Sequence, residues 1–283
     1  MILVKNLVIQ LAKLLLFWVL FFDFQRLMFS IHNWDKFQDV SWGNWFMTFL
    51  YSLRLDLATA AFLCVLPLLF LIVRFLYPSK WTKTLFIGVV IVEALLCSLI
   101  HSGEINAYPE WNHKLTSRVF MHLSNPDEVF RTADYSMTIW FIVYVTLELL
   151  FAWRITQILF LRKELPELNQ KLFVKIPIAV LLWGSTMIGL FIMARGGLQQ
   201  IPININSAYF TNNHTANDLA VNSAYYFANS YLLYNRSEID DLMPDIDRSE
   251  SRKIVEDYYN YPKDHDVRIL DNERPNVVFI IME

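Results

Sequence analysis

The sequence predicts an all-α membrane protein, a bundle of five transmembrane helices followed by a polar helical segment and one β-strand. Hydrophobic residues make up 55% of the 283 residues and aromatic residues 16%, too apolar a composition for an ordinary soluble domain. Five long apolar runs precede residue 195, and the chain turns polar after it. The formal net charge of −3 offers no basic surface for a phosphate backbone, so the sequence argues against a nucleic-acid partner.

Each apolar run is long enough, or nearly so, for the roughly 20 residues that a bilayer requires. No small-residue cleavage site follows the first run, so we expect a retained anchor and not a signal peptide. The second run exceeds the required length, and we expect it to tilt or to project from the membrane. The runs are Leu7 to Phe22, Trp45 to Leu76, Thr84 to Ile100, Met137 to Leu161 and Phe173 to Ala194.

The Lys and Arg residues that flank these runs predict the orientation. With the N-terminus in the cytoplasm, ten of them face inward: Lys5, Lys13, Arg74, Lys80, Lys83, Arg154, Arg162, Lys163, Lys171 and Lys175. Only Lys36, Lys114, Arg118 and Arg131 then lie in outer loops. The positive-inside rule therefore favours a cytoplasmic N-terminus, and an odd number of spans places everything after Arg195 outside the cell.

One long loop, Ser102 to Asp134, lies between the third and fourth spans. Helical spacing of apolar residues and the sequence Asn125-Pro126-Asp127-Glu128 predict two short helices at the outer interface. Tyr108 and Trp111 are expected to anchor the approach to them at the membrane surface. A plain connector is the alternative.

Charged residues inside the spans are the candidate functional groups, because each needs a partner in the membrane. Asp23 and Arg26 share a helix face and can pair. Arg54 and Asp56 point to nearly opposite sides, so each must reach another helix, water or a ligand. We expect Arg54 and Asp56 to form part of an outward-facing seat for an anionic lipid headgroup, since a guanidinium binds phosphate through two parallel hydrogen bonds. The alternative is an Arg-to-Glu bridge between helices, with Glu93 or Glu148 nearer mid-membrane.

Other residue types give weaker signals. Cys64 and Cys97 both fall inside apolar runs, where cysteine usually serves as a small packing residue. The acids between Asp240 and Asp247 are typical of a solvated linker and not of a metal site. The sequence contains no Gly-rich phosphate loop and no Rossmann fingerprint.

The chain after the fifth span contains a turn, a helix and a strand. Gly196 and Gly197 suit a sharp turn out of a helix, and a helix is expected near Asn217 to Leu233. Val277 to Ile281 is a short apolar run without alternation, as in a buried parallel strand. It ends at Glu283, and open α/β sheets bind their ligands at the carboxyl ends of such strands.

Three features together resemble the lipoteichoic acid synthase family, membrane-anchored phosphoglycerol transferases related to alkaline phosphatase. They are the final segment RPNVVFIIME (274 to 283), the RGGLQ turn (195 to 199) with the following Ser207-Ala208-Tyr209-Phe210, and the five spans. The resemblance covers essentially the whole chain. It implies a membrane domain over 1–195, an extracytoplasmic linker over 196–272, and at 273–283 the first strand of a truncated, sulfatase-like α/β catalytic domain.

The resemblance also implies an activity in the bacterial cytoplasmic membrane. A metal-dependent transferase would move a phosphoglycerol-type headgroup from an anionic phospholipid to a cell-envelope acceptor, with Mn²⁺ or Mg²⁺ as the metal. Glu283 would be one metal ligand. The threonine nucleophile and the other ligands of the family would lie beyond position 283, so we expect the chain as given to contain no catalytic residue and to be inactive.

Two alternatives remain open. A phosphoethanolamine transferase has the same architecture, although the Gly-Gly turn argues against it, and the residues after Glu283 would distinguish the two. A non-enzymatic five-span transporter or scaffold, with the buried charges forming a substrate path, is the alternative from another class.

Overall fold

A computed structural model describes residues 2–119, 134–161, 172–236 and 247–259, and in these ranges the chain is helical without a strand. Five of the described helices are long and apolar enough to cross a membrane, in agreement with the predicted count. They are α1 (Ile2–His32), α2 (Trp42–Leu63), α4 (Lys80–Trp111), α7 (Tyr135–Thr156), which a π-helical turn η2 (Gln157–Leu161) extends, and α8 (Leu172–Ala194). The predicted strand Val277 to Ile281 lies outside the described residues.

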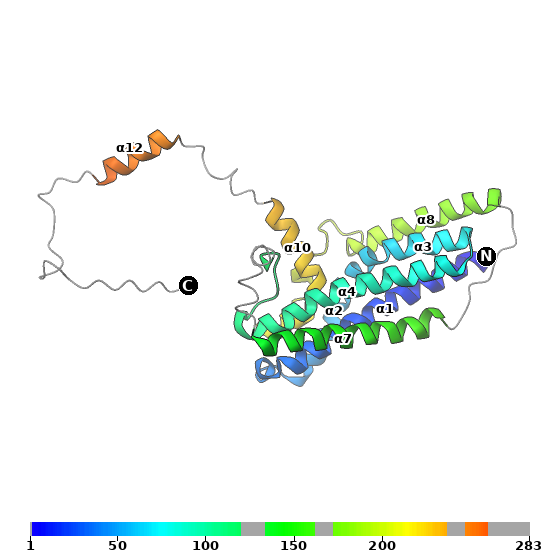
Figure 1. Ribbon diagram of the computed structural model, residues 1–283, viewed down its shortest axis with the longest axis horizontal. Helices are drawn as coiled ribbons and strands as arrows, with labels where there is room; N and C mark the ends of the chain where they lie inside the picture. The colour runs from blue at the N-terminus through cyan, green and yellow to red at the C-terminus, as the bar shows by residue number, and fades with distance from the viewer. Residues whose placement is uncertain (1, 120–133, 162–171, 237–246, 260–283) are drawn as a thin grey trace, which may run out of the picture. The chain divides into compact units, whose positions relative to one another are not determined.

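The five helices run side by side along one axis (Figure 1). One end of the bundle, the proximal end, holds the N-terminus and the turn between α3 (Val65–Leu76) and α4. The opposite, distal end holds the connection 33–41 between α1 and α2, with its short helix η1 (Trp34–Phe37), and the last turns of α4. With 23 residues against 32 in α4, α8 starts at the proximal end and stops before the distal end.

Local signals at the helix starts agree with this arrangement. Ser41 caps α2 by accepting a hydrogen bond from the backbone N–H of Asn44 at 3.2 Å. Ser79 and Thr82 form a reciprocal capping box at the start of α4. Both serines end short connections, so the chain reverses direction with one of the free N–H groups of the new helix satisfied by the cap.

The second predicted span is not one long helix, which corrects the expectation of a single tilted span. α2 ends at Leu63, and α3 (Val65–Leu76) continues after Cys64. Pro67 explains the break, because proline has no N–H to donate to the carbonyl four residues earlier and its ring collides with that carbonyl. Together α2 and α3 extend between the distal and proximal ends (Figure 1).

The helix of the third span is longer than predicted. α4 continues to Trp111, so its last ten residues occupy the start of the expected loop Ser102 to Asp134. Tyr108 is 1% exposed and is therefore a buried residue and not the interfacial anchor we expected, whereas Trp111 is 41% exposed. The expected helix start at Asn125-Pro126 lies outside the described residues.

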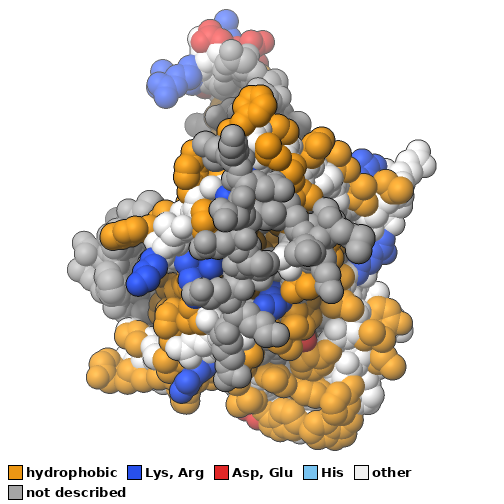
Figure 2. Space-filling view, turned by 90° about the vertical axis from the view of Figure 1, so that its right-hand side faces the viewer, with side chains coloured by type: hydrophobic (Ala, Val, Ile, Leu, Met, Phe, Trp, Pro, Cys, Tyr) orange, Lys and Arg blue, Asp and Glu red, His pale blue; other side chains and the backbone are white. Residues whose placement is uncertain are grey.

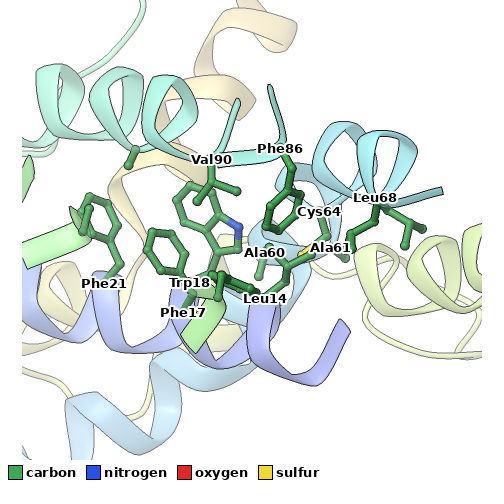
Figure 3. Close-up of a cluster of buried hydrophobic side chains, with 14 of the residues drawn as sticks. Leu14, Phe17, Trp18, Phe21, Ala60, Ala61, Cys64, Leu68, Phe86 and Val90 are labelled. Carbon is green, nitrogen blue, oxygen red and sulfur yellow. The ribbon is translucent and has the colours of Figure 1, made fainter. Parts of the chain in front are cut away.

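The proximal half of the bundle has an aromatic core centred on Trp18 of α1 (Figure 3). The ring of Trp18 is fully buried and lies edge-on to Phe17, with centroids 5.0 Å apart. Val90 and Phe86 of α4 cover it from the other side, and Ala60 and Ala61 of α2 allow close approach. Small residues beside large rings are typical of membrane bundles, where close packing and not expulsion of water holds helices together.

The proximal end is rich in basic side chains. Figure 2 looks onto this end and shows Lys and Arg side chains among the hydrophobic ones. Arg74, Lys80 and Lys83 flank the α3–α4 turn there. This is the distribution that the predicted cytoplasmic N-terminus requires; the orientation itself remains a prediction.

After α8 the chain turns back onto α2. A Schellman motif ends α8, with Gly197 N–H donating to Ile192 O and Gly196 N–H to Met193 O, both at 2.9 Å. Both glycines have positive φ, +83° and +125°, as the sequence suggested. A Cβ on Gly196 would lie 2.6 Å from Cβ of Ile203, so glycine is required there for two reasons.

The polar segment then forms a short 3₁₀ turn and two helices. They are η3 (Ile205–Ala208), α9 (His214–Ala220) and α10 (Ser223–Arg236), which corrects the single helix expected near Asn217 to Leu233. The break at Val221 and Asn222 lets both residues point into the bundle, where they are buried. Ile203, Ala208, Ala220 and Val221 pack on Leu55 and Ala58 of α2.

Residues 1–236 form one compact unit, so 196–236 of the expected linker pack with the membrane helices. The second unit is 237–283, and its described part is α12 (Arg248–Tyr259). Ile254, Val255, Tyr258 and Tyr259 are exposed on α12.

Candidate functional site

The two predicted substrate residues, Arg54 and Asp56, point away from each other, as helix geometry suggested. Asp56 is fully buried and accepts hydrogen bonds from Arg26 of α1 at 2.6 Å and from Asn222 at 2.8 Å. Arg54 is exposed and donates to Oε1 of Gln199 at 2.5 Å. The two residues therefore do not form one site.

Arg26 is the centre of the first buried charge cluster at the distal end. Its Nη1 pairs with Asp23 at 3.2 Å, as the spacing predicted, and its Nε donates to the carbonyl of Leu219 at 3.2 Å. With Nη2 on Asp56, all three guanidinium nitrogens are used. Such saturation is what a buried charge needs, because an unpaired ion in a low-dielectric interior is costly. Oδ2 of Asp56 has no hydrogen-bond partner among the described residues.

A second cluster surrounds Glu104 near the end of α4. Its Oε1 accepts from Lys114 Nζ at 2.6 Å and from Ser223 Oγ at 2.7 Å, and its Oε2 accepts from the Leu115 N–H at 3.3 Å. Lys114 also donates to the carbonyl of Asp218 at 3.2 Å. Lys114 and Glu104 are 3% and 1% exposed, so the pair is buried.

Asp218 of α9 connects this cluster to the surface. Its Oδ2 accepts from the Tyr108 hydroxyl at 2.8 Å and lies 3.0 Å from Nδ1 of His214, a side chain that is 71% exposed. Burial raises the pKa of the Asp218 carboxyl above its usual value, and the Lys114 ammonium opposes part of that rise.

A third cluster lies closer to the middle of the bundle. Glu148 of α7 is fully buried and accepts from Gln25 at 2.7 Å, and His101 Nδ1 lies 2.6 Å from its other oxygen. Glu93, about two turns before His101 on the same face of α4, has no hydrogen-bond partner for Oε2 among the described residues. The predicted Arg-to-Glu bridge is thus replaced by an Arg26-to-Asp56 bridge and a Glu148 cluster with His101.

The three clusters surround a small pocket at the distal end. It is lined by Phe22, Gln25, Arg26, Phe29, His101, Glu104, Lys114, Leu219, Val221, Asn222 and Ser223. The volume open to the centre of a water molecule is about 10 Å³, enough for about one water. We call the buried polar groups that bridge the helices and residues 218–223 the distal network: Arg26, Asp56, Glu104, Lys114, Asp218, Asn222 and Ser223.

Two arginines outside the distal network meet at the turn after α8. Nη2 of Arg54 reaches Oε1 of Gln199 and, at 3.5 Å, the carbonyl of Gly196. Nη2 of Arg195 donates to the carbonyls of Gln199 at 3.2 Å and Gln200 at 2.9 Å. Among the described residues, neither arginine pairs with a carboxylate.

No cluster of three or more His, Cys, Asp or Glu side chains suited to a metal ion occurs in the described ranges. The predicted metal ligand Glu283 lies outside them. Cys64 and Cys97 are free and buried, in agreement with a packing role.

Sequence reasoning missed most of the distal network. A usable signal was present in α4, where Glu93, Cys97, His101, Glu104 and Tyr108 recur every three or four residues and so share one face. Their partners Lys114, Asp218 and Ser223 had no such signal, because they come from segments up to 119 residues away.

Comparison with known proteins gives no relative: no protein-family profile, no curated protein and no solved structure matches the chain.

Proposed function

We propose that the chain is the membrane and linker portion of a metal-dependent transferase that moves a phosphoglycerol-type headgroup from a phospholipid to a cell-envelope acceptor. The proposal starts from the sequence resemblance in 195–210 and 274–283. Five apolar helices followed by a polar segment suit such an enzyme. A cytoplasmic N-terminus would place residues after Arg195 beside the outer leaflet.

The observation that carries the proposal is the exposed guanidinium of Arg54. Unlike the buried Arg26 and Lys114, which pair with carboxylates, the exposed Arg54 has no carboxylate partner among the described residues. Its neighbours are an amide oxygen and a backbone carbonyl, both neutral. A guanidinium in such surroundings is available to an anionic headgroup. Asp56 has a different role, since it holds Arg26 and Asn222 inside the bundle.

The distal network supports a fixed linker. Residues 218–223 bond to Arg26, Asp56, Glu104 and Lys114, which belong to α1, α2, α4 and the segment after α4. The stretch that leads toward 237–283 therefore starts from a fixed base on the membrane helices. A catalytic domain attached there would work near the lipid surface.

The ligands of the metal would be residues outside the described ranges. Glu283 is the proposed ligand, and a hard divalent cation needs about six oxygen ligands, so a single carboxylate cannot hold it. When bound, the ion would stabilise negative charge on phosphate oxygens and help to ionise a hydroxyl nucleophile.

The experiment uses the full-length protein, with whatever the coding sequence encodes beyond Glu283. Arg54→Ala is expected to lower headgroup transfer from phospholipid vesicles while hydrolysis of a soluble phosphodiester stays unchanged. Lys36→Ala, which loses a solvent-exposed hydrogen bond to Asn112, is the control for both assays. Equal loss of both activities in Arg54→Ala, with folded protein, would refute the assigned role. A stop codon directly after Glu283 would refute the transferase proposal.

The alternatives are less well supported. A phosphoethanolamine transferase differs in the headgroup, and transfer assays with both lipids distinguish the two. For a transporter, the relevant observation is the polar face of α4 with Glu93, His101 and Glu104. The pocket beside it holds about one water, too little for a solute path in this conformation.

A further inference from the structure

We propose that Arg54 and Arg195 together bind the phosphate of an anionic phospholipid at the turn 195–201. The inference deepens the proposed function, on which its choice of partner rests, by adding a second arginine and a membrane-facing turn to Arg54. Both guanidiniums contact the same residue, Gln199, one through its side-chain oxygen and the other through its backbone oxygen. Positive charges from α2 and from the end of α8 therefore both lie against Gln199.

Each guanidinium has donors left for a ligand. The hydrogen bonds that the structure gives to Arg54 and Arg195 use one nitrogen, Nη2, of each. Arg26 differs, because its Nε, Nη1 and Nη2 are all bonded to protein oxygens. The remaining Nε and Nη1 groups of each arginine can each donate a charge-assisted hydrogen bond to a phosphate oxygen.

The spacing of basic residues agrees with headgroup depth for both arginines when α2 and α3 together form one crossing from Arg54 to Arg74. Arg54 and Arg74 are 20 residues apart along α2 and α3, and Lys175 of α8 is 20 residues from Arg195, which directly follows α8. At 1.5 Å per residue, 20 helical residues span about 30 Å, the thickness of the hydrocarbon core. Each pair thus brackets one crossing, with Arg54 and Arg195 at the same boundary.

The turn also exposes apolar side chains beside the two charges. Leu198 is 86% exposed and Ile201 is 70% exposed. Large apolar groups next to basic ones are the pattern by which protein surfaces enter the boundary between headgroups and acyl chains. A lipid satisfies both features, since its phosphate meets the arginines and its acyl chains meet Leu198 and Ile201. Free phosphate satisfies only the first.

The turn is held in place before any ligand arrives. The Schellman motif fixes Gly196 and Gly197, and Ile203 N–H donates to Arg195 O at 2.9 Å. Gly196 lies directly against Ile203, so the turn cannot shift toward it. A preorganised site loses less conformational entropy on binding than a flexible one.

The test measures lipid binding to the purified chain 1–283 in a neutral detergent by native mass spectrometry. Short-chain phosphatidylglycerol, phosphatidylcholine and inorganic phosphate are titrated separately. We expect phosphatidylglycerol to bind at least about tenfold more tightly than phosphatidylcholine. The double variant Arg54→Gln/Arg195→Gln should lose that preference, and the matched control Arg248→Gln on α12 should keep it.

Two further measurements make the result decisive. Arg54→Lys/Arg195→Lys keeps the charges but offers fewer N–H donors at fixed positions, so intermediate affinity is expected, and this variant serves if the glutamine variant does not fold. Equal binding of both lipids by the unaltered chain, an unchanged preference in the folded double variant, or displacement of the lipid by equimolar inorganic phosphate would overturn the proposal. The assay needs no catalysis, so a complete enzyme without transferase activity would refute the proposed function and leave this site untouched.

Discussion

Nη2 of Arg26 lies 2.6 Å from Oδ1 of Asp56, and this contact joins α1 to α2 where both side chains are shielded from solvent. Asp23 shares the same guanidinium from the other side, at 3.2 Å. Two acids therefore depend on one arginine. Loss of Arg26 should be more damaging than loss of either acid.

We expect Arg26→Met to destabilise the protein by about 3 to 5 kcal/mol, because it leaves Asp56 buried with Asn222 as its remaining polar partner. Asp56→Leu should cost less, since Arg26 keeps Asp23. The double variant Arg26→Met/Asp56→Leu should recover much of the loss, since no buried charge of the pair remains. Thermal unfolding in detergent measures all three, with exposed Asp39→Ala as control. Additive losses in the double variant would contradict the coupling.

Lys114→Met should release residues 218–223 from the bundle. The change removes the three hydrogen bonds that Nζ of Lys114 donates to Glu104, Asp218 and Ser223. It leaves the Glu104 carboxylate buried without its cation. A penalty of about 3 kcal/mol or more corresponds to at least a roughly hundredfold increase in local opening. Limited proteolysis followed by peptide mass analysis should therefore show faster cleavage within 203–222. Lys36→Met, which loses an exposed bond to Asn112, should be cleaved like the unaltered chain; equal rates in both variants would show that Lys114 does not hold this segment.

Gly196→Ala should destabilise the unit by about 2 kcal/mol or more. The positive φ of +83° disfavours alanine, and the new Cβ would lie 2.6 Å from Ile203. Gly184→Ala, in the middle of α8 with open space around its Cα, is the matched control and should be neutral. Denaturation midpoints of the two variants give the comparison. An unchanged midpoint for Gly196→Ala would mean that the turn adapts easily.

Asp218 should make stability fall as pH rises. Burial raises the pKa of its carboxyl in the folded state, so the folded protein binds this proton more tightly than the unfolded chain does. The resulting stabilisation is fully present below the unfolded pKa of about 4 and disappears as pH increases through the raised folded value. Lys114, Tyr108, His214 and Glu104 are the charged or titratable groups that affect it.

Melting temperatures of the unaltered chain and of Asp218→Asn, measured from pH 4 to pH 8, isolate this contribution. The stability of the unaltered chain relative to the variant should decrease with rising pH. Asparagine can still accept the Tyr108 hydrogen bond, so the comparison isolates the titrating carboxyl. Parallel pH profiles would show that Asp218 does not titrate differently on folding.

The features that could be predicted correctly from the sequence are those that depend on residues close together in the chain. Five spans follow from the length of apolar runs, and the Asp23–Arg26 pair and the divergence of Arg54 and Asp56 follow from helix geometry. The break after Leu63 was also predictable, because Pro67 was visible inside the second run. The expectation of one helix relied on the length of the apolar run and neglected the proline inside it.

The remaining errors come from contacts between distant segments. α4 continues through polar residues to Trp111 because Glu104 and Tyr108 find partners in 114–115 and 218–223, which no local pattern indicates. The division into α9 and α10 likewise depends on Asn222 reaching Asp56. The strand and the metal-ligand role of Glu283 remain predictions, outside the residues described.

The bond from Asn222 to Asp56 joins residues 166 positions apart, and this separation sets an order of assembly during synthesis. Arg26 and Asp56 emerge close together, so α1 and α2 can enter the bilayer as a hairpin whose charges already neutralise each other. At 5 to 20 residues per second, Asn222 is made about 8 to 33 s after Asp56. Glu104 likewise has no Ser223 partner until that residue has been synthesised. The buried polar groups at the distal end of the bundle therefore stay partly unpaired until residues 218–223 have been translated.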